Sequence, residues 1–95
     1  MKIQDLHLKD KAVSAISLFK ATDNTVMALQ ILAHQVLKEH VTKVPALLIC
    51  LEGKVVFRNE KGVEETLSMG DYIKIEPMVK HWVEGVLNSQ LLLFK

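Results

Sequence analysis

The chain of 95 residues is long enough for one domain with its own core and too short for two. Its 12 Lys and Arg residues nearly balance its 11 Asp and Glu residues, and Arg58 is the single arginine. Because nucleic-acid binding needs clustered cations, nucleic acid is not expected as a partner. Without a membrane-spanning run, a signal-peptide pattern or a second cysteine, the chain is expected to be cytoplasmic, with no membrane contact.

The first half of the chain predicts an arm followed by extended segments. Residues 1–11 carry charges every few positions and predict a surface arm. Residues 12–21 fit a strand or a short helix, with a strand favoured, and an Asp-Asn turn separates them from an apolar strand over residues 25–32. That extended segment is expected to continue through Val36 and Leu37 after a break at His34.

The apolar run over residues 46–51 leads through Gly53 into a second run, residues 55–57. This pattern predicts a buried antiparallel hairpin around which the other strands pack. Alternation along the first run places Ala46, Leu48 and Cys50 on one face. The opposite face is apolar too, so we expect both to be covered. Cys50 is more simply a small buried hydrophobe than a reactive thiol.

Further strands are predicted near the C-terminal end, each bounded by turn residues. In all, about eight short strands with turn signals every 8–12 residues are typical of an all-β sandwich or barrel. The strands expected in this part of the chain cover residues 63–67, 72–75, 81–84 and 90–94.

Two sets of residues resemble the paired motifs of the cupin family of small β-barrels. Gly70, Pro77 and His81 follow the spacing of its second motif, while His40 and Gly53 match the first histidine and closing glycine of its first motif. The resemblance implies a single-domain, all-β cupin-like double-stranded β-helix, a small jelly-roll barrel, over residues 1–95. Two glycine positions of the motifs are occupied by other residues, His34 and Met78.

The family's metal ligands, three histidines and a glutamate, are largely missing. The resemblance places the four positions at His40, Thr42, Ala46 and His81, so only two imidazoles remain. Durable divalent sites generally have three or four protein ligands. We therefore expect no resident cofactor and at most a weakly bound divalent metal (Zn, Ni, Fe or Mn) at His40 and His81. Candidates for an unrecognised third ligand, each more simply a loop or turn residue, are His34, Glu52 and Glu76.

These observations favour a protein that binds a small molecule in the barrel mouth, with little or no catalysis. The predicted ligand-binding residues are His40, Thr42, Cys50 and His81. The alternative is a metal-dependent cupin enzyme, of dioxygenase or isomerase type, whose reduced ligand set is built on His40 and His81. No catalytic residue is assigned.

A third hypothesis is a protein whose main role is association. Residues 91–94 are apolar on both faces, and an exposed edge of that kind favours aggregation. Trp82 should face away from the neighbouring His81. A homodimer that covers the last strand and Trp82 would explain both, although a central position in the barrel would also explain the strand.

Overall fold

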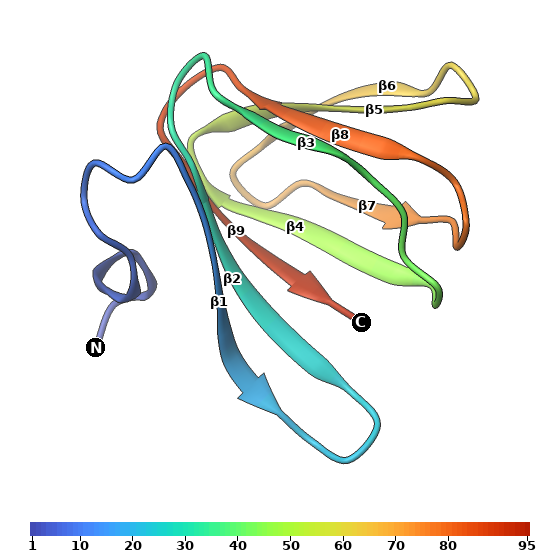
Figure 1. Ribbon diagram of the computed structural model, residues 1–95. Coiled ribbons are helices and arrows are strands. Elements are labelled where there is room, and N and C mark those ends of the chain that lie inside the picture. Colours follow the sequence, from blue (N-terminus) through green and yellow to red (C-terminus); the bar gives the residue numbers. More distant parts are fainter.

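The computed structural model describes residues 1–95 and contains nine strands and one short 3-10 helix. Two antiparallel sheets pack against each other (Figure 1). Their elements are η1 (Ile3–Leu6), β1 (Val13–Lys20), β2 (Thr25–Ile31), β3 (Val36–His40), β4 (Ala46–Glu52), β5 (Lys54–Asn59), β6 (Glu64–Ser68), β7 (Tyr72–Ile75), β8 (His81–Gly85) and β9 (Ser89–Phe94).

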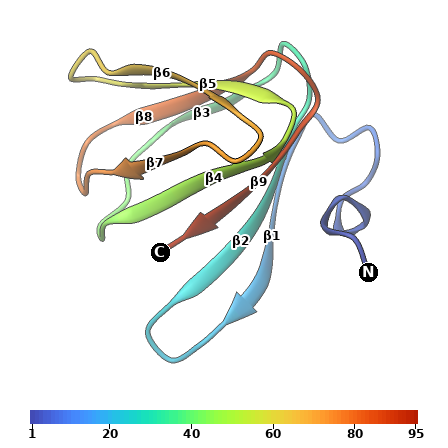
Figure 2. The same cartoon turned by 180° about the vertical axis from the view of Figure 1, so that it is seen from behind.

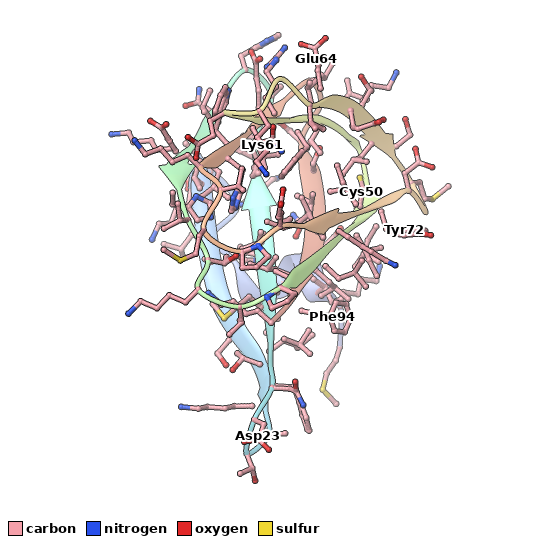
Figure 3. All side chains as sticks on the ribbon, turned by 90° about the vertical axis from the view of Figure 1, so that its right-hand side faces the viewer. Asp23, Cys50, Lys61, Glu64, Tyr72 and Phe94 are labelled. Carbon is pink, nitrogen blue, oxygen red and sulfur yellow. The ribbon has the colours of Figure 1, made fainter.

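The strands are shared unequally between the sheets. The five-stranded sheet has the order β1-β2-β9-β4-β7, and the four-stranded sheet has the order β3-β8-β5-β6. The connections cross repeatedly from one sheet to the other, as in a jelly roll, so the predicted all-β double-stranded β-helix is confirmed. The β1–β2 hairpin extends beyond the rest of the molecule, with Asp23 at its tip (Figure 3).

The predicted hairpin between residues 46–51 and 55–57 is wrong. β4 is already paired on both sides, by β7 and β9, so β5 turns away and enters the other sheet. Gly53 makes this corner with a φ of 89°, a conformation that residues with a side chain rarely adopt. A Cβ atom there would collide with the backbone carbonyl of Asn88. Gly53 was correctly predicted to be a turn residue, but the turn joins two sheets and does not form a hairpin.

The segment predicted to continue through Val36 and Leu37 also divides. β2 ends at Ile31, and β3 begins at Val36 in the opposite sheet, where it pairs with β8. Between them His34 is an exposed turn residue with a φ of 67°, which redirects the chain. This break accounts for one more strand than the sequence predicted.

β9 is a central strand, so of the two explanations for the apolar residues 91–94 the central position is confirmed and the edge is excluded. The strand lies between β2 and β4 and is paired along both sides (Figure 2). Phe94 belongs to this sheet, whereas Trp82 lies in β8 of the other sheet. The two residues therefore lie in different sheets. A homodimer stays a prediction, without the edge argument that motivated it.

The predicted alternation of β4 is confirmed on its inner face. Ala46, Leu48 and Cys50 are buried in a cluster of 12 core residues between the sheets. Leu47 and Ile49 point outward and are only half-buried, so the outer face is less covered than expected. The inner face alone supplies the strand's part of the hydrophobic core.

The N-terminal arm packs against the five-stranded sheet. η1 contacts β2, and the Gln30 side chain of β2 donates hydrogen bonds to the carbonyls of Leu8 and Lys11. His7, within the arm, is buried and contacts Ser14 of β1. No helix of the structure is long and apolar enough to cross a membrane.

Candidate functional site

His40 and His81 meet where β3 ends and β8 begins. They are direct cross-strand partners in the antiparallel pair. Their ring centroids are 4.2 Å apart, with an angle of 61° between the planes. The sequence predicted that these two histidines approach each other, and the register of the two strands now shows how they do so.

Both rings are oriented by backbone carbonyls. Nδ1 of His40 is 2.8 Å from the carbonyl oxygen of Lys38, and Nδ1 of His81 is 3.2 Å from that of Val79. A carbonyl can only accept a hydrogen bond, so Nδ1 must carry the proton in each ring. In the neutral imidazole this leaves Nε2 as an acceptor. The backbone therefore leaves Nε2 of each ring without a proton and able to accept a hydrogen bond.

His81 is kept neutral by its surroundings. Its ring is 2% exposed and stacks on Phe57, with 5.6 Å between the centroids. Burial lowers its pKa, and the nearby His40 lowers it further, although the hydrogen bond to Val79 acts in the opposite direction. A neutral imidazole can accept a hydrogen bond or bind a metal ion, whereas a protonated one can do neither.

Thr42 follows His40 after one exposed residue, Val41, and is itself 6% exposed. Its backbone carbonyl accepts a hydrogen bond from the Met78 amide, but its buried hydroxyl oxygen has no protein partner. An unpaired buried hydroxyl is costly, so it marks a position where a ligand group would be stabilising. Of the four predicted ligand-binding residues, only Thr42 has a buried polar atom without a hydrogen-bond partner.

Cys50 lies towards the opposite end of β4 from Ala46. Its thiol is directed at the carbonyls of Glu52 and Gly53, at sulfur–oxygen distances of 3.5 and 3.9 Å. Burial raises the pKa of this thiol, so it is a neutral donor to the chain's own turn. The structure thus brings His40 and His81 together and places Cys50 at the corner around Gly53.

The residues present do not fit the resident metal centre that the cupin motifs imply. The structure contains no group of three His, Cys, Asp or Glu side chains suited to a metal ion. Ala46, at the family's glutamate position, is buried beside Ile75 and offers no donor. Two imidazoles alone leave most of a divalent ion's coordination shell to water or to another molecule.

None of the three candidate third ligands joins the histidine pair. His34 lies in the turn before β3, at the opposite end of that strand from His40. Glu52 ends β4, and Glu76 forms an ion pair with Lys61 at 3.0 Å. His34 and Glu76 thus lie outside the strands, as the simpler interpretation expected, whereas Glu52 is the exposed last residue of β4.

Two turn residues at glycine positions of the cupin-like motifs have a left-handed backbone. His34 and Met78 have φ values of 67° and 65°, in the left-handed region that glycine prefers. Both turns thus hold a side chain in a conformation that glycine adopts freely.

None of the five principal cavities of the molecule is lined by His81, Thr42 or Cys50. His40 lines one cavity with other residues of β3 and with Ala12 and Val13 at the start of β1. The pocket role of the four predicted residues therefore stays a prediction.

The chain has the fold of cupin proteins. A cupin superfamily protein from Desulfitobacterium hafniense superimposes with a TM-score of 0.86 at 13% identity, covering 98% of this chain and 84% of its own. An RmlC-like cupin family protein with a double-stranded β-helix fold from Methanocaldococcus jannaschii gives 0.79 at 12% identity, covering 94% and 84%. A Thermus thermophilus protein gives 0.84 at 21%, covering 99% and 92%. No protein-family model matches the chain, and no curated protein matches it significantly. These likenesses show the fold and no activity.

Proposed function

We propose that the protein binds a small molecule at the His40–His81 pair, with little or no catalysis. The observation that carries the proposal is the pair itself, because both Nδ1 atoms are engaged by the backbone and both Nε2 atoms are left as acceptors. The unpartnered hydroxyl of Thr42 adds a group that can donate or accept. The ligand that fits this set offers hydrogen-bond donors to the two imidazoles.

A metal-dependent enzyme of dioxygenase or isomerase type is the weaker alternative. It would need a divalent ion held by His40 and His81, and the surrounding residues supply no third ligand. A weakly held ion could still reach the pair together with a small molecule. The two imidazoles therefore bind the small molecule directly, and this binding does not require a metal ion.

Native mass spectrometry of the untagged protein tests the proposal. After incubation with a metabolite extract, the wild-type protein should carry at least one small-molecule adduct. His40→Phe and Thr42→Val should lose it, while Thr66→Val on the exposed part of β6 should keep it. Identical adducts on all four proteins, or none on the wild type, would reject the proposed site.

A further inference from the structure

A polar row crosses the outer face of the five-stranded sheet beneath the arm. Ser14, Gln30, Gln90 and Glu52 are successive cross-strand partners on β1, β2, β9 and β4. Ser14 and Gln30 are only 5% and 3% exposed. Burying such groups is unfavourable unless their hydrogen bonds are made. A buried polar row within largely apolar strands therefore calls for a physical reason.

The hydrogen bonds of this row determine the orientation of both carboxamides. Gln30 Nε2 lies 2.9 Å from the Leu8 carbonyl and 3.0 Å from the Lys11 carbonyl, which uses both of its hydrogens. Its Oε1 must then face Gln90, whose Nε2 donates to it at 2.9 Å. Gln90 Oε1 is consequently a buried acceptor, and no protein donor reaches it.

A second buried atom in the same place lacks a partner. His7 is 7% exposed, and its Nδ1 lies 2.7 Å from the Ser14 hydroxyl. Its Nε2 has no protein partner. Burial lowers the pKa of this ring, and the charge of Lys11 lowers it further, so the neutral form is favoured. The Ser14 hydroxyl can donate or accept, so the ring can adopt the tautomer in which Nδ1 donates to Ser14 and Nε2 is a second acceptor.

His7 and Gln90 line one cavity of about 510 Å³ between the arm and the sheet. The carboxylates of Asp5 and Glu52 and the ammonium of Lys9 also line it, and Leu32 is its one hydrophobic residue. Among the charged groups of the lining, two carboxylates stand against one ammonium. The chain has no three-ligand cluster suited to a metal ion, which favours an organic donor. A positively charged group with several N–H donors matches this lining.

We propose that this cavity binds a small molecule through its primary ammonium group. The three N–H donors of such a group are complementary to Gln90 Oε1, His7 Nε2 and a carboxylate of the lining. Both unpartnered atoms are shielded from bulk solvent, so the wall of the cavity must move slightly for the ligand to reach them. Because few hydrogen bonds hold the arm to the sheet, it is the part of the wall that can adjust. This site is separate from the His40–His81 pair.

Titrations followed by ¹⁵N-resolved NMR test the proposal with three matched probes: ethanolamine, its neutral counterpart ethylene glycol and its anionic counterpart glycolate. Ethanolamine should cause saturable shifts of the arm and of residues around Gln90. The other two should cause weaker shifts or none. Gln90→Met, which keeps the length of the side chain but removes the acceptor, should weaken ethanolamine binding at least several-fold.

Glu52→Gln provides a second variant, because it keeps the size of an exposed side chain and removes its charge. It should also weaken ethanolamine binding, whereas Glu39→Gln on the exposed part of β3 should not. Equal binding of ethylene glycol would overturn the requirement for an ammonium group. The proposal would also be overturned if no saturable shift appeared, which would mean that water alone satisfies the cavity, or if the shifts persisted in both cavity variants.

Discussion

His40 and His81 face each other as direct partners across β3 and β8, and the backbone holds both rings by Nδ1. This arrangement separates the protein from the metal centre implied by the cupin motifs. The two histidines lie in contact, while Thr42 and Ala46 occupy the remaining ligand positions that the resemblance implies. The site can therefore accept hydrogen bonds or a loosely held ion.

The first prediction concerns metal affinity. Untagged wild-type protein purified without added metal should contain substoichiometric metal, because two imidazoles hold a divalent ion weakly. Combining Thr42→His with Ala46→Glu restores the four ligand types at their motif positions and should raise zinc or nickel affinity by orders of magnitude. Calorimetry measures this change. One tightly held ion per wild-type chain would contradict the prediction, as would a folded double variant that binds no better.

The second prediction concerns the cost of the Thr42 hydroxyl. Thr42→Val keeps the shape of the side chain and removes a buried oxygen without a partner. The free energy of unfolding should stay unchanged or rise by up to about 1 kcal/mol, since no hydrogen bond is lost. Urea denaturation measures it, with Thr66→Val as an exposed control. A clear loss of stability at Thr42 would mean that the hydroxyl makes an important bond within the protein.

The third prediction concerns the two left-handed turn residues. At φ values of 67° and 65°, His34 and Met78 carry the strain of a side chain in a region that glycine occupies freely. His34→Gly and Met78→Gly should each raise the free energy of unfolding by about 1 kcal/mol. Glu39→Gly, within β3, should lower it. Equal destabilisation by all three glycines would show that the two turns are not strained.

The fourth prediction concerns pH. The pKa of His7 is held below its ordinary value of 6.5 in the folded protein. Between these two pKa values the unfolded chain binds more protons than the folded one, so the free energy of unfolding falls as the pH falls. His81 acts in the same direction. Urea midpoints at about pH 7.5 and about pH 5.5 should therefore differ, and His7→Leu should reduce the difference. A variant with an unchanged difference would exclude His7 as a source.

The sequence predicted the layered fold but not all of its connections. Alternation along residues 46–51 identified the inner face correctly, because burial between two sheets imposes a period of two. The same glycine signal fits a hairpin and a corner between sheets, and only the pairing of β4 with β7 and β9 decides between them. The apolar last strand was ambiguous for the same reason, since an edge and a centre can have the same composition.

The candidate site was predictable where the cupin motifs specify it and unpredictable elsewhere. Motif spacing predicted the meeting of His40 and His81, but the position of Cys50 at the corner depends on where β4 ends. The arm cavity was missed because its residues come from distant parts of the chain. Gln30, a carboxamide inside an apolar strand, was the one visible signal of it.

The most direct measurement of the central claim is the tautomeric state of the two site histidines. In protein labelled with ¹⁵N histidine, at about pH 8, where ordinary imidazoles are neutral, NMR distinguishes a protonated ring nitrogen from an unprotonated one. The structure predicts that His40 and His81 both carry the proton on Nδ1 and leave Nε2 bare, and that a bound ligand shifts both Nε2 signals. A proton on Nε2 of either ring would contradict the account, because the pair would then lack the two acceptors on which ligand binding depends.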